Sequence, residues 1–115
     1  METYKISYTL SNYVLEVVIK LDFFSKKTVG EQFTRSIGSI SANIEEGFRR
    51  YSKKDKIRFF RISLGSVFES LDWNQKSLTR NLLNVDQYNF IFNELQKLPK
   101  SINSLISFTN NKLQI

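Results

Sequence analysis

Residues 39–56 read SISANIEEGFRRYSKKDK, and this stretch predicts the end of one helix and the start of another. The apolar positions of its first half lie four apart, at Ile40, Ile44 and Phe48. This is the spacing of one helix face. We expect Gly47 to be a C-cap glycine with a positive φ angle, so that the first helix ends there. Ser52, with Asp55 three residues later, predicts an Asp variant of the capping box that opens the next helix.

Apolar residues continue at helical spacing on both sides of this stretch. Four stripes follow one another: Leu10, Val14, Val17, Leu21 and Phe24; Phe33, Ile37, Ile40, Ile44 and Phe48; Ile57, Phe60, Leu64, Val67, Phe68, Leu71 and Leu78; and Val85, Tyr88, Phe92, Leu95, Leu98, Ile102, Leu105 and Thr109. The runs SKKTVG (25–30) and NLLNVDQ (81–87) interrupt the pattern. Pro99 lies inside the fourth stripe and predicts a kink or two abutting helices. We therefore expect one all-α domain over residues 1–115, an antiparallel up-and-down four-helix bundle whose last helix is kinked near Pro99.

The composition limits the chemistry that the chain can perform. It has no cysteine and no histidine, which removes thiolate nucleophiles, the commonest general base and the commonest transition-metal ligand. No apolar run approaches the ~20 residues that span a bilayer. The first residues, METYKISYTL, lack the layout of a signal peptide. We expect a soluble cytoplasmic protein that is not an enzyme and needs no metal or cofactor.

Positive charge is concentrated between Gly47 and Arg61, a segment that we call the basic elbow. It holds seven basic residues and one acid, so its net charge of +6 equals that of the whole chain. The helix macrodipole disfavours cations at the start of a helix, so helix stability does not explain them. Lys54, Arg58 and Arg61 lie within about 60° of one another around the helix, away from the core stripe.

This charge pattern favours binding of nucleic-acid phosphates. The candidate contact residues are Arg49, Arg50, Lys53, Lys54, Arg58 and Arg61. Nothing in the pattern predicts contacts to base edges, so we expect RNA or DNA to be bound through its backbone without sequence preference. Two alternatives remain open, namely a solvated surface with no ligand and a protein partner with an acidic patch.

Three polar residues near the predicted core need partners: Asn43, Glu46 and Glu69. Buried amides and carboxylates must be hydrogen-bonded, so we expect a network that fixes the second helix against the third. The two glutamates also have oxygens suited to a divalent cation, although no third acidic ligand is evident. Gly65 and Ser66 lie inside the third helix, where glycine costs about 1 kcal/mol relative to alanine. A close backbone approach, inside the bundle or between subunits, is expected to offset that cost.

The second and third helices carry features beyond those of a simple bundle. Small residues gather in the second helix, at Ser36, Gly38, Ser39, Ser41 and Ala42. They predict close packing, either inside the monomer or between subunits. Four residues of the third helix are candidates for a subunit contact: Phe59, Ile62, Ser66 and Trp73. A second apolar face indicates a second partner, so we expect a homo-oligomer; alternatively, Phe59 and Ile62 cover a neighbouring helix.

The elbow and its flanks resemble a known sequence signature over residues 32–69. The pattern Q..R...SI..NI.EG is matched at Gln32, Arg35, Ser39, Ile40, Asn43, Ile44, Glu46 and Gly47. The pattern S.k....F..ia.GS..E is matched at Ser52, Lys54, Phe59, Ile62, Gly65, Ser66 and Glu69. Both resemble the four-helix-bundle protein family, also called the 23S rRNA-intervening sequence proteins. Glu45 and Ser63 depart from the pattern, because that family commonly has alanine there.

The resemblance implies an antiparallel four-helix bundle that assembles into five-fold rings, and it brings no catalytic residues. A related branch, the accessory variability determinants of diversity-generating retroelements, is similar in fold, is basic, and works with a reverse transcriptase and nucleic acid. Two functions are therefore expected. One is a pentameric nucleic-acid-binding protein. The other is a homo-oligomeric scaffold or accessory subunit for a protein partner such as a reverse transcriptase.

Overall fold

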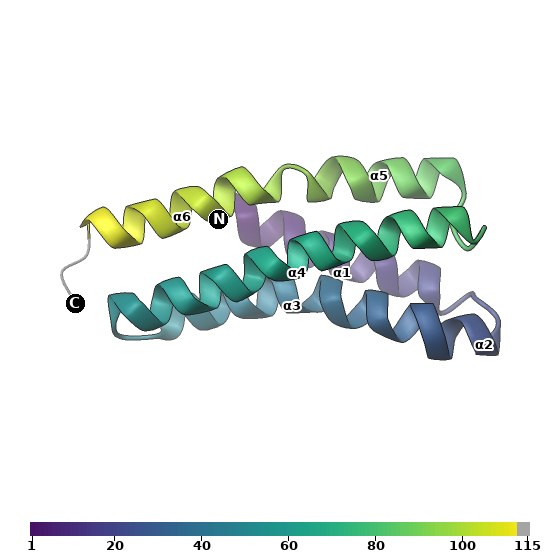
Figure 1. Ribbon diagram of the computed structural model, residues 1–115, viewed down its shortest axis with the longest axis horizontal. Helices are drawn as coiled ribbons and strands as arrows, with labels where there is room; N and C mark the ends of the chain where they lie inside the picture. The colour runs from purple at the N-terminus through teal and green to yellow at the C-terminus, as the bar shows by residue number, and fades with distance from the viewer. Residues whose placement is uncertain (113–115) are drawn as a thin grey trace.

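The computed structural model describes residues 1–112, and its regular structure is helical. The elements are α1 (Glu2–Val18), α2 (Phe23–Ser25), the π-helical turn Lys26–Gly30, α3 (Glu31–Arg49), α4 (Lys53–Thr79), α5 (Val85–Leu95) and α6 (Leu98–Lys112). Three rods are formed by α1, by α3 and by α4, and α5 with α6 forms the fourth (Figure 1). The predicted four-helix bundle is confirmed, with extents of 49 × 23 × 19 Å. No helix in this described part is long and apolar enough to cross a membrane.

The second helix begins earlier than the sequence pattern predicted. The predicted break at residues 25–30 is wrong, because the chain is helical from Phe23 through the π-helical turn into α3. Asp22 caps this start: its Oδ1 accepts a hydrogen bond from the backbone N–H of Ser25 at 2.9 Å, which lowers the pKa of Asp22. Gly30 allows close packing against α1, since an added Cβ would lie 2.8 Å from Val18 Cγ1.

Pro99 marks two abutting helices, which was one of the two predicted alternatives. α5 ends at Leu95 and α6 begins at Leu98, so Pro99 lies in the first turn of α6. A proline costs no helical hydrogen bond there, because the first-turn N–H groups have no acceptor in the helix. Leu95 and Leu98 are both fully buried, so the apolar stripe continues across the break.

The core follows the predicted stripes in their middle parts and departs from them at helix ends. Its largest fully buried side chains include Leu10, Phe33, Ile37, Ile40, Ile44, Phe60, Leu95, Leu98 and Ile102, together with Ile91, which the pattern missed. Five stripe residues are exposed instead: Phe24, Phe48, Phe68, Val85 and Phe92. Phe24, Phe48 and Val85 lie near the ends of helices, and Phe48 remains about half exposed although its ring packs edge-on against that of Phe60. Phe68 lies one position round α4 from the buried Val67.

Small hydroxyl side chains line the contact between α3 and α4. Two hydroxyl pairs cross it, Ser36 with Ser70 at 3.0 Å and Ser39 with Ser66 at 2.9 Å. The fully buried Ser63 donates to the carbonyl oxygen of Ile40 at 2.8 Å. Short side chains let the two backbones approach closely, and their mutual hydrogen bonds satisfy the buried oxygens. The small residues at Ser36 and Ser39 therefore serve packing inside the monomer.

One end of the bundle is made of three helices. α1 begins at Glu2, and Figure 1 shows the α3–α4 hairpin and the last turns of α6 extending past this start. Lys53 Nζ links the hairpin to α6 by donating to the carbonyl oxygen of Asn110 at 3.2 Å. The basic elbow therefore lies at an end of the molecule that α1 does not cover.

Candidate nucleic-acid interface

The basic elbow comprises the end of α3, a tight turn at residues 50–52 and the first turns of α4. Arg50, directly after α3, is extended, with φ −73° and ψ 152°. Ser52 caps α4, because its hydroxyl accepts a hydrogen bond from the backbone N–H of Asp55 at 3.2 Å. Lys56 Nζ donates to the carbonyl oxygen of Phe48 at 3.0 Å. This bond gives a partner to one of the last carbonyl groups of α3, which have none within the helix. The predicted N-cap at Ser52 is confirmed, but among the described residues Asp55 accepts no reciprocal hydrogen bond from the Ser52 backbone N–H that would complete the predicted capping box. Lys56, one of the elbow cations, has a structural role.

Gly47 does not end its helix, and the predicted C-cap is wrong. α3 continues to Arg49, and no described glycine has a positive φ. Gly47 is buried against Phe60: an added Cβ would lie 2.5 Å from Cε1 and 2.8 Å from Cδ1 of that ring. The ring occupies the space that a side chain would need, so Gly47 is a packing residue of the hairpin.

Two of the six predicted contact residues, Arg49 and Arg50, form ion pairs with glutamates of α3. Arg49 Nη2 lies 2.6 Å from Glu46 Oε1, and Arg49 Nε lies 3.6 Å from Glu45 Oε1. Arg50 Nε lies 2.9 Å from Glu46 Oε2. The basic elbow begins at Gly47, so its net charge of +6 does not include Glu45 and Glu46. The positive charge at the end of α3 is therefore largely compensated.

Two arginine side chains lie over the ring of Phe59, which was predicted to face a second subunit. The guanidinium carbons of Arg50 and Arg58 lie 4.6 Å and 4.5 Å from its ring centre. Cation–π contacts at exposed sites contribute roughly 0.5–1 kcal/mol each. Arg58 also lies 3.9 Å from an Asp55 carboxylate oxygen, a longer contact than those of Arg50. Arg58 is thus held in position with much of its charge still available.

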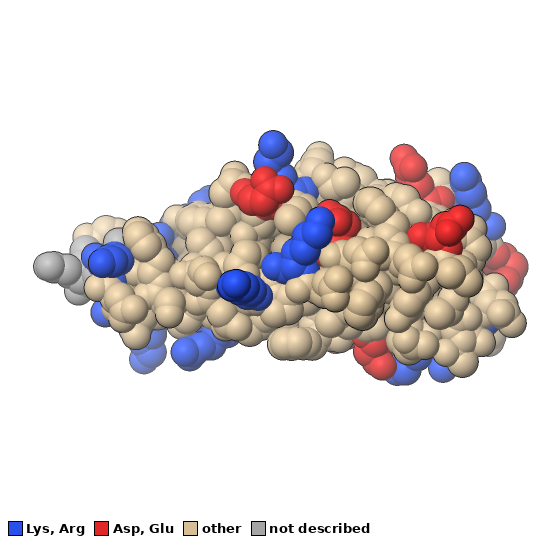
Figure 2. Space-filling model, turned by 90° about the horizontal axis from the view of Figure 1, so that it is seen from above, with Lys and Arg blue, Asp and Glu red and all other residues tan. Residues whose placement is uncertain are grey.

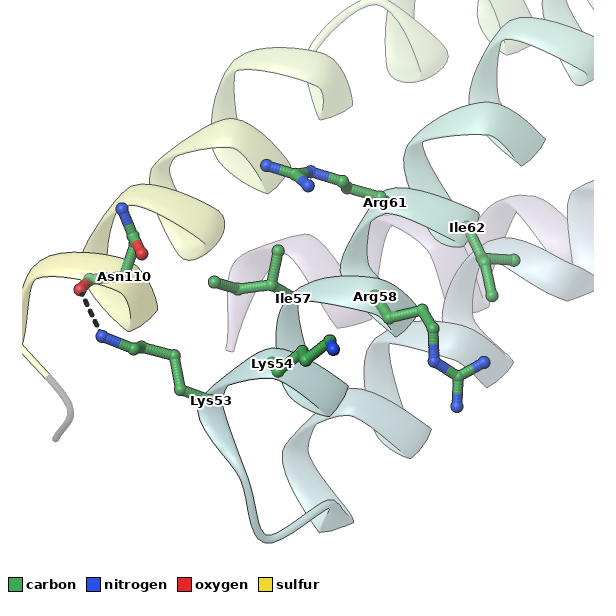
Figure 3. Close-up of a pocket in the computed structure, with 7 residues that line it drawn as sticks. All are labelled: Lys53, Lys54, Ile57, Arg58, Arg61, Ile62 and Asn110. Carbon is green, nitrogen blue, oxygen red and sulfur yellow. Dashed lines mark hydrogen bonds between the residues drawn. The ribbon is translucent and has the colours of Figure 1, made fainter. Parts of the chain in front are cut away.

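The remaining predicted contact residues line a groove of about 670 Å³ across the first turns of α4 (Figure 3). Its lining comprises Lys53, Lys54, Ile57, Arg58, Arg61 and Ile62 of α4 and Asn110 of α6. Lys54 and Arg61 form no ion pair with any described residue. On the face in Figure 2, the end of the molecule where α6 finishes carries Lys and Arg but no Asp or Glu. Four of the six predicted contact residues are thus brought together.

The predicted network of Asn43, Glu46 and Glu69 is not formed. Asn43 Nδ2 donates to the carbonyl and hydroxyl oxygens of Ser39, both at 2.8 Å, within α3. Glu69 is exposed, and Glu46 is paired with arginines. The hydroxyl pair of Ser39 and Ser66 links the helices instead. Within the described chain, no group of three or more His, Cys, Asp or Glu residues is placed to hold a metal ion.

The residues predicted to face a second subunit are mostly accounted for inside the monomer. Ser66 is bonded to Ser39, and Trp73 packs partly against the core. Ile62, by contrast, is 42% exposed. Gly65 has open space around it, with no atom within 4 Å of an added Cβ, so no contact in the bundle offsets its cost. Ile62 and Gly65 therefore remain unexplained by the single chain.

Comparisons with known proteins agree with this architecture. The crystal structure of a protein with unknown function from the S23 ribosomal protein family of Bacteroides thetaiotaomicron superposes with a TM-score of 0.80. The two sequences are 23% identical over 90% of this chain and 97% of that chain, a similarity that shows the fold alone. No curated protein sequence matches the chain. The family model of the 23S rRNA-intervening sequence proteins matches residues 1–104, and the chain therefore belongs to this family.

Proposed function

We propose that the protein is a non-enzymatic nucleic-acid-binding protein whose contact surface is the groove on the first turns of α4. The observation that carries this proposal is the gathering of Lys53, Lys54, Arg58 and Arg61 around one groove, with Asp55 the only carboxylate paired to any of them among the described residues. Lysine and arginine side chains clustered on one face attract phosphates and release counterions when they bind them.

The basic residues differ in how freely they can meet a phosphate. Lys54 and Arg61 have no ionic partner among the described side chains, whereas Arg49 and Arg50 have glutamate oxygens within 3 Å. An existing ion pair must be broken or shared before its arginine can bind another anion. We therefore expect Lys54 and Arg61 to contribute more to binding than Arg49 and Arg50, with Arg58 between them.

A salt titration tests this function. The affinity for labelled oligouridine and oligothymidine is measured by fluorescence anisotropy across a range of NaCl concentrations. Log affinity should fall linearly with log salt, by roughly 0.7 per phosphate neutralised on a single strand. The double variant Lys54→Gln/Arg61→Gln should reduce the slope by about 1.4, corresponding to two lost contacts.

The matched control removes the same charge elsewhere. Lys5→Gln/Lys20→Gln changes two exposed lysines away from the groove and should leave the slope nearly unchanged. Equal losses in the two double variants would show that only net charge matters. An affinity that does not respond to salt would refute phosphate binding.

A second candidate function is a homo-oligomeric scaffold, or an accessory subunit for a protein partner such as a reverse transcriptase. It is favoured by the outer face of α4, where Ile62 and Phe68 are 42% and 56% exposed on either side of the uncovered Gly65. A second backbone packed on this glycine would offset its cost in the helix. The family resemblance makes a five-fold ring the expected assembly.

Static light scattering tests this assembly. The native chain should have a mass near five times 13.5 kDa, and Ile62→Glu should lower that mass. Leu15→Glu, at a similarly exposed position of α1, is the control and should not lower it. A monomeric native chain at micromolar concentration would contradict the scaffold function.

A further inference from the structure

The groove on α4 has an apolar floor that phosphate binding alone does not require. Ile57 is only partly exposed, yet it is not among the residues packed against the hydrophobic core. Figure 3 shows Ile57 and Arg61 both pointing toward α6, where Asn110 lies. The groove therefore combines an apolar surface at Ile57 with surrounding lysine and arginine side chains. The aliphatic parts of these side chains add to the apolar surface.

We propose that this floor takes the base of one unpaired nucleotide while the surrounding cations hold its phosphates, an inference that rests on the nucleic-acid function proposed above. The groove volume of about 670 Å³ lies within the range of sites that bind small organic molecules, roughly 300–1,000 Å³. A nucleotide combines a flat base with an anionic phosphate, which matches the pairing of Ile57 with Lys54 and Arg61.

Asn110 supplies polar contact without selecting a base. Its carbonyl oxygen already accepts the hydrogen bond from Lys53 Nζ, whereas its side chain is at the edge of the groove (Figure 3). An amide both donates and accepts, so it can pair with the edge of any base. Binding at this position is therefore expected to tolerate all four bases.

The apolar floor distinguishes single strands from duplexes. In a duplex the bases are stacked on one another, and mainly phosphates and sugars face outward. Only an unpaired nucleotide can turn its base onto Ile57. Proteins that bind single strands without sequence preference join a cationic groove to side chains that contact base faces, most often aromatic ones; in this groove the apolar contact is made by Ile57.

An abasic oligonucleotide separates base binding from phosphate binding. Anisotropy is measured with oligothymidine and with an abasic strand of the same length, which has the same phosphates and no bases. The native protein should bind oligothymidine about fivefold or more tightly. Ile57→Ser should remove most of this difference, whereas Leu15→Ser, on the exposed side of α1, should preserve it. Circular dichroism melting checks that each variant remains folded.

The outcomes separate this inference from the function on which it rests. Equal, salt-dependent affinity of the native protein for both strands would overturn base binding and leave phosphate binding intact. A preference for oligothymidine that survives in folded Ile57→Ser would overturn the assignment to this groove. Failure to bind either strand would overturn the nucleic-acid function itself.

Discussion

Replacing Gly47 by alanine tests the packing of the α3–α4 hairpin most directly. The glycine lies inside α3 with a helical φ, so alanine fits the backbone conformation. The added methyl group, however, would lie 2.5 Å, 2.8 Å and 3.1 Å from three atoms of the Phe60 ring. Phe60 is 1% exposed and belongs to the core, so the ring has little room to move. We expect Gly47→Ala to destabilise the protein.

The magnitude follows from two effects of opposite sign. Alanine is favoured over glycine in a helix by about 1 kcal/mol. Overpacking a close-packed core costs typically about 1–3 kcal/mol, and contacts below 3 Å place this substitution in the upper part of that range. The free energy of unfolding should therefore fall by about 1–2 kcal/mol. For a domain of this size the Tm should fall by roughly 4–8 °C.

Gly65 provides a matched comparison in the next helix. It lies in the interior of α4, and no atom lies within 4 Å of an added Cβ. Gly65→Ala should therefore stabilise the single chain by about 1 kcal/mol, the helix preference alone, whereas a loss of stability would indicate the second backbone that the scaffold function places on this glycine. Both variants are measured by urea and thermal denaturation, followed by far-UV circular dichroism at equal protein concentration. The two alanine substitutions should shift stability in opposite directions.

A double variant identifies the ring as the cause. Phe60→Leu removes part of the ring, so its combination with Gly47→Ala should cost at least about 1 kcal/mol less than the sum of the single changes. Additive effects would show that the methyl group and the ring do not interact. A Gly47→Ala variant as stable as the native chain would refute the packing role of Gly47 altogether.

Three other residues, Glu69, Ser63 and Asp22, give simpler predictions. Glu69→Ala should change the free energy of unfolding in urea by less than about 0.5 kcal/mol, because Glu69 is exposed; a larger loss would restore the predicted network. Ser63→Val should cost about 1–3 kcal/mol in the same assay, since it removes the 2.8 Å bond to the Ile40 carbonyl and adds bulk; native stability would contradict this. The Ser25 backbone N–H lowers the pKa of Asp22 from 3.8, so the stabilisation by this cap is complete above that pH and decreases as the pH falls below it. In thermal melts across pH, Asp22→Asn should lack this acid-dependent loss of stability. Identical pH profiles for the native chain and the variant would exclude a stabilising role of the cap.

Two structural features that were not predicted, the ion pairs at the end of α3 and the polar face of α4, nevertheless have a signal in the sequence. Glu45 stands four residues before Arg49, and Glu46 stands three residues before Arg49 and four before Arg50. These are the spacings of ion pairs on one helix. The buried polar residues of α4 also recur at helical spacing, in steps of seven, four and three residues, at Ser63, Ser70, Asn74 and Ser77. This periodicity indicates a polar contact face, although only the fold identifies α3 as a partner across it.

The fold class, the N-cap at Ser52 and the two possibilities for Pro99 could be predicted from local patterns, because helical periodicity and capping depend on residues within one or two turns. The sequence also located the excess positive charge. The packing of the helices was needed to show that Gly47 makes room for the Phe60 ring, that Gly65 has no contact with other helices, and that Ile57 lines a groove beside Asn110. These roles depend on which side chains of other helices come within a few ångströms. Spacing along a single helix carries no information about those distances.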